Sequence, residues 1–204
     1  MATVTTRIGL ADHGRPMTLG EFLDAEEEPG YRYELARGVL EVTEVPNDPH
    51  GLIEWTILQV IAGYSKAHPG RVWRCGGSGS FRLWLPGMGS GRNPDVSVVL
   101  RGATKDPRGR RIPALAIEIV SPRGEERDYV TKREEYLAYG LREYWIVDPS
   151  SKKVTVLERN GDVWAERFYA ADQVIESLVL PGIAVKVADL WVVEDEADDD
   201  MEAK

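Results

Sequence analysis

The sequence predicts an α/β fold in which a mixed β-sheet is flanked by helices. Two segments with the apolar spacing of amphipathic helices, residues 49–68 and 127–139, are separated by short apolar runs that are typical of strands. One such run, residues 114–120, is apolar except at Glu118, as in a strand that is covered on both faces. The interleaving of helices and strands favours a mixed sheet with helices on its faces.

The composition is that of a chain with one good-sized core. With 204 residues, 43% of them hydrophobic, we expect one domain over residues 18–193, after an N-terminal arm of residues 1–17 and before an acidic, disordered tail of residues 194–204. No apolar run reaches the length of a membrane span, and the N-terminus lacks a signal-peptide pattern. The single cysteine, Cys75, excludes an intrachain disulfide and fits a cytoplasmic protein.

The first part of the domain is predicted to contain a short helix, a hairpin and a long helix. Thr18 followed by Glu21 forms the pattern of a capping box, which predicts a helix start. Apolar and polar residues alternate on both sides of Arg37 and Gly38, which predicts a β-hairpin that turns at these two residues. The long helix over residues 49–68 follows this hairpin.

The rest of the chain is predicted to consist of strands around a second helix. Residues 71–85 are interpreted as a strand, a glycine-rich break and a strand, and residues 95–100 as a further strand. The helix over residues 127–139 ends at Gly140, a residue suited to a helix C-cap. The three strands predicted after it cover residues 143–148, 152–160 and 163–170.

Charge is distributed unevenly along the chain. The formal net charge is −9, but residues 194–204 hold seven acidic residues and one lysine, so the rest of the chain carries only −3. Residues 71–111 contain nine basic residues against two acidic ones, a formal +7. This asymmetry suggests a polyanion as partner, with a merely solvated basic loop as the alternative. The candidates for contacts with a nucleic-acid backbone are Arg92, Arg108, Arg110 and Arg111.

Asp95 and Glu118 are the candidate metal ligands. Asp95 directly precedes one predicted strand, and Glu118 lies inside the next. If these strands are neighbours, the two carboxylates meet at one end of the sheet and repel each other unless a cation lies between them. A carboxylate inside an apolar strand is also costly without compensation. The pair therefore predicts a divalent cation, Mg²⁺ with Mn²⁺ as a possible substitute, because such ions prefer oxygen ligands.

Lys132 is the candidate for a catalytic cation. Asp128, Lys132, Tyr136 and Gly140 recur every four residues and therefore lie along one stripe of the second helix. Lys132 is thus placed to reach back toward the end of the Glu118 strand, where an ammonium group orients a water or stabilises the charge of a phosphate. A simple pairing of Lys132 with Asp128 is the alternative.

Several polar residues have structural interpretations. Glu118 could form an ion pair with Arg111 of the basic stretch instead of binding a metal. Glu34, among apolar neighbours in the hairpin, either serves the site or braces the hairpin. His50, at the start of the long helix, is interpreted as a structural histidine, and Tyr136 as a residue of the core.

Five motifs in this order resemble a known family. They are YELARG at residues 33–38, NPDVSVV at 93–99, AIEIVSP at 116–122, DYVTKREEYLAYG at 128–140 and REYWIVDP at 142–149. Together they are similar to the Uma-type putative restriction endonucleases, which belong to the PD-(D/E)-x-K nuclease superfamily. The resemblance runs from about Thr18 to about Leu190.

The resemblance implies a restriction-endonuclease-like core in which the two acids above are metal ligands. It further implies that the carbonyl group of Ile119 is a ligand and that Glu34 is an accessory acid. The superfamily places a lysine two residues after the second acid, where this chain has Val120. The resemblance assigns the role of that lysine to Lys132 on the following helix.

The predicted function is Mg²⁺-dependent hydrolysis of DNA phosphodiester bonds by an endonuclease, with Asp95, Glu118 and Lys132 as catalytic residues. Because cutting both strands commonly uses two sites, we expect a homodimer, and we expect no membrane association. The alternative is a nuclease-derived module that binds nucleic acid or a protein without cutting, which Val120 and the acidic overall balance favour. A metal-dependent hydrolase of another phosphate ester is a third possibility.

Overall fold

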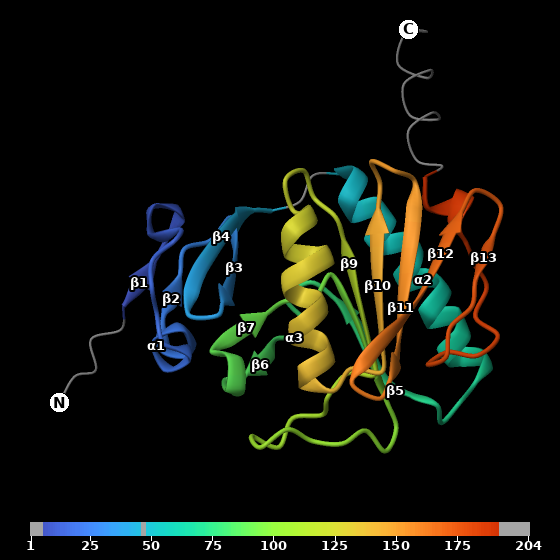
Figure 1. Cartoon of the computed structure of the whole chain (residues 1–204), viewed down its shortest axis with the longest axis horizontal. Helices are drawn as coiled ribbons and strands as arrows, with labels where there is room; N and C mark the ends of the chain where they lie inside the picture. The colour runs from blue at the N-terminus through green and yellow to red at the C-terminus, as the bar shows by residue number, and fades with distance from the viewer. Residues whose placement is uncertain (1–5, 46–47, 192–204) are drawn as a thin grey trace, which may run out of the picture. The chain divides into compact units, whose positions relative to one another are not determined.

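The computed structural model of the chain describes residues 6–45 and 48–191, which divide into two compact units (Figure 1). The first unit comprises residues 6–45 and 79–94, and the second comprises residues 48–78 and 95–191. The expected acidic tail of residues 194–204 lies outside the described residues. The expectation of one domain over residues 18–193 stays a prediction.

The first unit is built around a four-stranded sheet in the order β4-β3-β7-β6, with a separate parallel pair, β1 and β2. The capping box predicted at its short helix is confirmed, because Glu21 N donates to Thr18 Oγ1 and Thr18 N donates to Glu21 Oε2. Its elements are β1 (Arg7–Ile8), the 3-10 turn η1 (Leu10–Asp12), α1 (Leu19–Asp24), β2 (Glu26–Glu27), β3 (Tyr31–Ala36), β4 (Val39–Glu44), β6 (Leu83–Leu85), the 3-10 turn η2 (Pro86–Met88) and β7 (Ser90–Arg92).

The predicted hairpin is the pair β3 and β4. Its turn residues Arg37 and Gly38 have φ angles of 49° and 83°, and two consecutive positive φ angles are typical of a type I′ turn. Gly38 adopts this angle without the steric cost that a Cβ atom brings. The residues expected to form an N-terminal arm are packed into this unit over their described part, because Ile8 and Met17 are buried in its core.

The second unit holds a six-stranded mixed sheet in the order β12-β11-β10-β9-β8-β5. β9 and β10 are parallel, and the other neighbouring pairs are antiparallel. The elements are α2 (Asp48–Ala67), β5 (Val72–Gly77), β8 (Val96–Leu100), β9 (Leu115–Ile119), the π-helical turn η3 (Arg127–Thr131), α3 (Lys132–Tyr139), β10 (Glu143–Asp148), β11 (Lys153–Asn160), β12 (Val163–Ala170), β13 (Val174–Ile175), β14 (Val185–Lys186) and the 3-10 turn η4 (Val187–Leu190).

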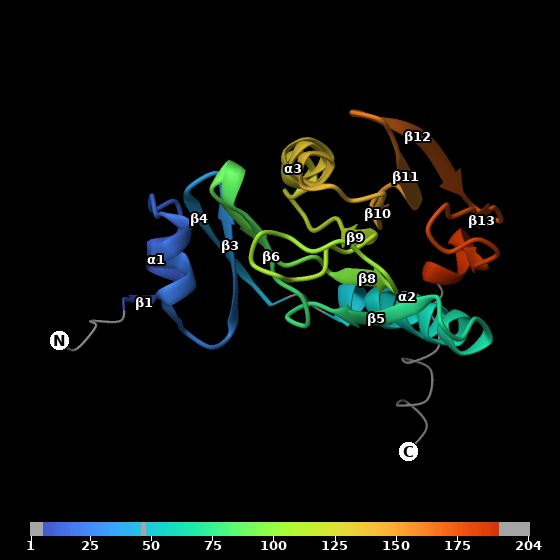
Figure 2. The ribbon, with the colours of Figure 1, turned by 90° about the horizontal axis from the view of Figure 1, so that it is seen from below.

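Helices α2 and α3 cover opposite faces of this sheet (Figure 2). On one face, Ile57 and Ile61 of α2 pack in one core with Ile117 of β9 and Trp145 of β10. On the other face, the ring of Tyr136 of α3 packs edge to face against the ring of Tyr144 of β10. The predicted mixed sheet with a helix on each face is therefore observed, and it explains why every residue of β9 is buried.

Helix α3 begins with a wide turn and ends at a glycine. In η3 the backbone N–H of Lys132 donates to the carbonyl of Arg127, five residues earlier. Gly140 caps the helix with a φ of 104°, as predicted, and this left-handed conformation suits glycine. None of the helices within residues 6–45 and 48–191 is long and apolar enough to cross a membrane.

The turn after β10 provides a test of stability against pH. Burial by itself would raise the pKa of Asp148, but hydrogen bonds from Ser150 and Ser151 outweigh it and hold that pKa below its usual value of 3.8. A lowered pKa means that the carboxylate contributes stability above its unfolded pKa, and that this contribution is lost as the pH falls through the folded value.

We therefore expect Asp148→Asn to lower the free energy of unfolding at pH 7 by about 1–2 kcal/mol, since charge-assisted hydrogen bonds are lost. The difference from wild type should shrink as the pH falls below about 3.8, the usual value of this group. Urea denaturation at pH 7 and pH 3 measures both effects. Asp162→Asn, at an exposed position of the next turn, is the control, and an equal loss in this variant would contradict the expectation.

Candidate functional site

Asp95 and Glu118 lie across from each other at one end of the six-stranded sheet. β8 and β9 are antiparallel neighbours in which Val96 pairs with Ile117, so the same register continued by one residue sets Asp95 opposite Glu118. Directly opposed residues point to the same face with Cβ atoms about 5 Å apart. The backbone N–H of Ile119 also donates to Asp95 Oδ2 at 2.7 Å. The expectation that these two strands are neighbours is confirmed.

Glu118 is compensated by groups on helix α3. Its side chain is nearly inaccessible, Lys132 Nζ lies 2.8 Å from Oε2, and the hydroxyl of Tyr136 donates to Oε1 at 2.5 Å. The alternative pairing with Arg111 is wrong, because the guanidinium of Arg111 lies over the ring of Trp73, 4.9 Å from its centroid. Tyr136 is buried as predicted, but its hydrogen bond to this carboxylate was not expected from the sequence.

Lys132 contacts two carboxylates at once. Besides Glu118, its Nζ lies 3.4 Å from Asp128 Oδ1, and Asp128 is also held by Arg127 at 3.1 Å. Asp128, Lys132 and Tyr136 are all buried, so the predicted stripe of α3 does face the sheet. Both interpretations of Lys132 therefore correspond to contacts in the structure. A π-helical turn such as η3 is frequent at functional sites.

The pKa of Tyr144, on β10, is affected by the carboxylates of this site. Burial raises the pKa of its phenol well above the usual value, and the negative charges of Asp128, Glu118 and Asp95 raise it further. Its hydroxyl therefore stays protonated and donates to the backbone carbonyl of Asp128 at 2.9 Å. Since this phenol is sensitive to all three carboxylates, they belong to one electrostatic neighbourhood.

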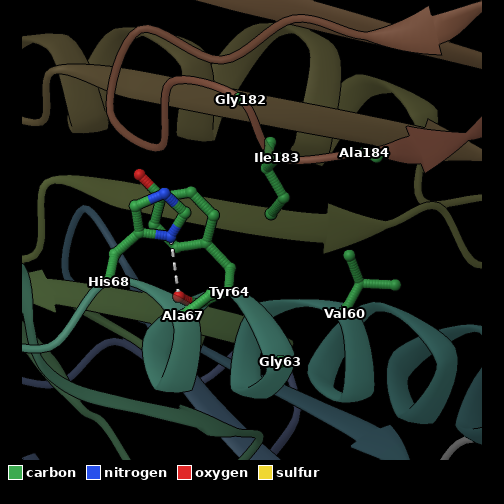
Figure 3. Close-up of a pocket in the computed structure, with 8 residues that line it drawn as sticks. All are labelled: Val60, Gly63, Tyr64, Ala67, His68, Gly182, Ile183 and Ala184. Carbon is green, nitrogen blue, oxygen red and sulfur yellow. Dashed lines mark hydrogen bonds between the residues drawn. The ribbon is translucent and has the colours of Figure 1, made fainter.

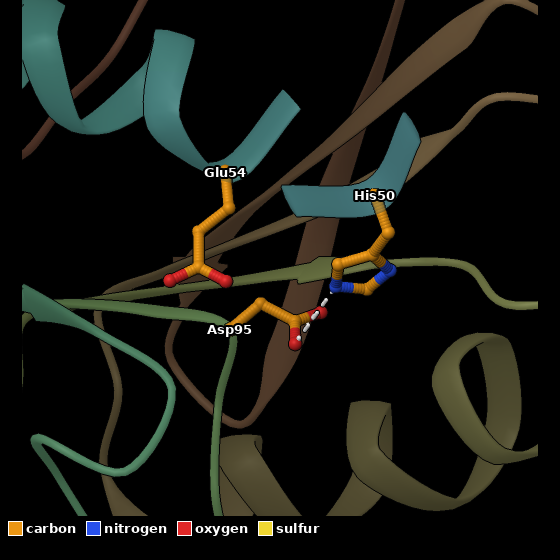
Figure 4. A group of neighbouring side chains, drawn as sticks. All are labelled: His50, Glu54 and Asp95. Carbon is orange, nitrogen blue, oxygen red and sulfur yellow. Dashed lines mark ion pairs between the residues drawn. The ribbon is translucent and has the colours of Figure 1, made fainter. Parts of the chain in front are cut away.

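A second group of ligand atoms meets Asp95 from the start of helix α2 (Figure 4). His50 Nε2 lies 3.2 Å from Asp95 Oδ1, and a ligand atom from each of His50, Glu54 and Asp95 lies within 4.8 Å of the others. His50 is 8% exposed, and its spacing of four from Glu54 puts the two on one side of the first helical turns. The structural interpretation of His50 missed this grouping, although that spacing is visible in the sequence.

The glycine-rich end of β5 makes room for Glu54. A Cβ atom on Gly77 would overlap the Glu54 carboxylate, so a larger residue would displace it. Next to it, the hydroxyl of Ser78 lies 3.4 Å from an oxygen of Glu54 and 3.4 Å from Asp95 Oδ1. The break that the sequence indicates between the two strands thus positions an acid of the site.

Arg92 is a correction to the expected nucleic-acid contacts. Its side chain is fully buried in the first unit, where Nη1 lies 3.3 Å from Glu34 and 2.7 Å from Glu41. Glu34 and Glu41 are directly opposite on β3 and β4, and like charges in that position repel without a cation between them. Arg92 therefore neutralises this pair and is not available to a phosphate backbone.

Glu34 belongs to the first unit, whereas Asp95, Glu118 and Lys132 belong to the second. Its carboxylate accepts a hydrogen bond from Asn93 N at 2.6 Å, in addition to the contact with Arg92. These contacts agree with the bracing interpretation. Its role as an accessory acid stays a prediction.

The basic loop lies at the other end of the sheet from Asp95. Asp95 precedes β8 and the loop follows it, and a five-residue strand spans about 17 Å. Within the loop, Arg110 pairs with Asp106 at 3.0 Å, so its charge is largely neutralised, while Arg108 is exposed. Arg108, Arg110 and Arg111 are therefore not at the end of the sheet that holds the two acids.

A cavity of about 270 Å³ lies near the C-terminal end of α2 (Figure 3). The rings of Tyr64 and His68 stack there with their centroids 4.1 Å apart, and His68 Nδ1 forms a hydrogen bond with the backbone carbonyl of Tyr64. His68 directly follows Ala67, the last residue of α2, whereas His50 lies in the first turn, so the helix puts about 26 Å between them. This cavity does not belong to the group around Asp95.

The comparison with protein families shows to which family the chain belongs. The model of the family described as "Uma2: Putative restriction endonuclease" matches residues 19–188, most of the chain. The chain belongs to this family. The Uma2 membership agrees with the resemblance inferred from the five motifs. A family of putative nucleases implies a nucleic acid as the class of substrate.

The solved structures agree with the fold. The chain is similar to the crystal structure of a putative nuclease belonging to DUF820 from Anabaena variabilis, with a TM-score of 0.70 and 22% sequence identity. The likeness covers 86% of this chain and 98% of that one. At this identity it establishes the fold only, which is the predicted restriction-endonuclease-like mixed sheet of a Uma2 protein. None of the curated proteins matches the chain.

Replacing Lys132 tests how much its buried ammonium group contributes to the stability of the fold. Lys132→Met leaves Glu118 and Asp128, which are 2% and 0% exposed, without this cation. We expect the free energy of unfolding to fall by about 3–5 kcal/mol, because an uncompensated buried charge is costly. Chemical denaturation of both proteins at pH 7 measures the change.

The double variant with Glu118→Gln serves as the control for this measurement. It removes the charge that Lys132→Met leaves behind, so we expect it to lose less than the sum of the two single losses. Strict additivity of the two losses would mean that this ion pair is not coupled in the folded state.

Proposed function

We propose that this Uma2 protein is a metal-dependent endonuclease that hydrolyses phosphodiester bonds of DNA with Mg²⁺ or Mn²⁺. The observation that carries the proposal is the group of Asp95, Glu118 and Lys132, which three separate elements bring to one end of one sheet. The family membership agrees with it.

The charges around Asp95 support a bound cation. Four carboxylates, those of Glu54, Asp95, Glu118 and Asp128, lie close together in this region, and Lys132 and Arg127 contact some of them. Carboxylates this close together repel one another, and a divalent cation offsets that repulsion. The donors are mainly carboxylate oxygens, which Mg²⁺ and Mn²⁺ accept.

In this proposal each residue has one role. Asp95 and Glu118 supply oxygen ligands, together with the carbonyl of Ile119, and the hydrogen bond from Ile119 N fixes the orientation of Asp95. A bound divalent ion supplies an activated water and offsets charge on the phosphate oxygens. Lys132 stabilises the negative charge that develops on the phosphate, and the hydroxyl of Tyr136 holds the Glu118 carboxylate in place.

The position of Lys132 supports the relocation of the superfamily's lysine. Position 120 is a valine, but Nζ of Lys132 reaches within 2.8 Å of Glu118 from the neighbouring helix. Only the final place of the ammonium group matters to the chemistry, so the helix can supply it as well as the strand. Glu34 as an accessory acid, a homodimer that cuts both strands and a cytoplasmic location complete the proposal.

Cleavage of supercoiled plasmid DNA tests this function. With Mg²⁺ or Mn²⁺ we expect wild type to nick or linearise the plasmid, and Asp95→Asn and Glu118→Gln to lower the rate about a hundredfold or more, since each removes a charge that the site uses. Asp162→Asn, on an exposed turn, should keep the wild-type rate. Equal rates in all four proteins would identify a contaminating nuclease and refute the proposal.

Arg123 is our candidate for a contact with the DNA backbone at this end of the sheet. It is exposed in the turn of residues 121–124 that follows β9, and this turn is closed by a 2.8 Å bond from Gly124 N to Ser121 O. Arg123 has a φ of 68°, a conformation that costs a residue with a side chain about 1–2 kcal/mol. An arginine at a position that glycine would occupy without strain suggests that its charge is used.

We expect Arg123→Gly to fold at least as stably as wild type, because the strained backbone is relieved, and to bind DNA more weakly. The slope of log K against log salt concentration should fall by about 1, as for the loss of one phosphate contact. Fluorescence anisotropy with labelled duplex in Ca²⁺ measures it. Arg142→Ala removes a charge before β10, at the opposite end of the sheet, and the same loss in this variant would argue against Arg123.

A binding module that does not cut is the second candidate. It is favoured by the Glu118 carboxylate, whose two oxygens already accept bonds from Lys132 and Tyr136. The exposed Trp73, with Arg111 stacked on it, offers such a module a surface for bases and phosphates. Salt-dependent DNA binding by wild type, without cleavage in either metal, would decide for this function.

A further inference from the structure

The Asp95 carboxylate is divided between two sets of partners. Its Oδ2 accepts the hydrogen bond from Ile119 N, on the side of β9. Its Oδ1 faces helix α2, where His50 Nε2 lies at 3.2 Å and the hydroxyl of Ser78 at 3.4 Å. The oxygen of Asp95 that faces a potential ligand nitrogen is therefore Oδ1.

His50 brings a buried nitrogen atom without a hydrogen bond into this group. Its Nε2 lies near Asp95 Oδ1, but the geometry does not make a hydrogen bond, and within the described residues this buried atom has no other hydrogen-bond partner. A buried polar atom in this condition costs free energy unless something else satisfies it. A neutral imidazole nitrogen is the commonest protein ligand of transition metals.

Glu54 is held in the same group by the backbone of β5. Ser78 N donates to Glu54 Oε1 at 3.2 Å, and the missing Cβ of Gly77 leaves the space that the carboxylate occupies. Figure 4 shows the side chains of Glu54 and His50 pointing from α2 toward Asp95. Two carboxylates and one imidazole thus converge from two separate elements.

We propose that His50, Glu54 and Asp95 bind a first-row transition ion, such as Mn²⁺ or Co²⁺, in preference to Mg²⁺. The proposal deepens the proposed function, on which it rests for the use of Asp95 as a ligand. The physical reason is the nitrogen ligand, because imidazole suits transition ions, whereas Mg²⁺ is served by carboxylate, carbonyl and water oxygens. Along the series Mg²⁺, Mn²⁺, Co²⁺ the affinity should therefore rise, and His50 should be its cause.

Calorimetric titration of the full chain with Mg²⁺, Mn²⁺ and Co²⁺, without DNA, tests this selectivity. We expect wild type to bind Mn²⁺ about tenfold or more tightly than Mg²⁺, and Co²⁺ more tightly than Mn²⁺, since a nitrogen ligand favours the later ions. In His50→Ala and His50→Gln the affinities for the three ions should converge. Circular dichroism establishes that each variant is folded before it is titrated.

His68→Ala is the matched control, because His68 directly follows Ala67, the last residue of the same helix, and is exposed. It should keep the selectivity of wild type. A second pair of variants tests the same site without touching the imidazole. Gly77→Ala places a methyl group where the Glu54 carboxylate lies and should weaken binding of all three ions, whereas Gly63→Ala meets open space on α2 and should not.

The outcomes separate this inference from the proposed function. Unchanged selectivity in both His50 variants, or equal affinity of wild type for Mg²⁺ and Mn²⁺, would overturn the inference even if plasmid cleavage depends on Asp95 and Glu118. Selectivity that is lost with His50, in a protein that fails to cut DNA under any condition, would support the metal site while the endonuclease proposal falls.

Discussion

The buried ion pair between Glu118 and Lys132 is the interaction on which the organisation of the second unit depends. A carboxylate within a strand that is covered on both faces is costly unless a cation contacts it at short range. That requirement fixes the face that α3 turns to the sheet, since Lys132 reaches Glu118 only when Asp128 and Tyr136 face inward too. The same ion pair thus determines both how α3 packs on the sheet and which polar side chains line the site.

Asp95 joins this polar group to a second one on the opposite side of the sheet end. Because it precedes β8, its carboxylate is not confined to one face, and it bonds to β9 while it faces His50 of α2. The residue therefore contacts β9 of the sheet and α2, the helix on one face of the sheet. At the end of a sheet, a residue outside the strands can thus serve as a ligand. A charged residue inside a strand would instead need a partner of opposite charge.

The first unit also holds a pair of acids that a buried cation neutralises. Glu34 and Glu41 face each other across the hairpin, and the buried Arg92 lies between them. The sequence placed Arg92 in a basic stretch and thereby predicted a surface contact, because summed charge along a chain does not distinguish a buried arginine from an exposed one. Only the pairing of β3 with β4 reveals that two acids need this cation.

The sequence by itself determined the local elements and the stripe of Asp128, Lys132 and Tyr136, because periodicity along one helix or strand is a property of neighbouring residues. Only the tertiary structure decided that β8 and β9 run antiparallel in the register that opposes Asp95 to Glu118, and that His50 and Glu54 approach Asp95. Those contacts join residues tens of positions apart, and their geometry follows from the packing of whole elements.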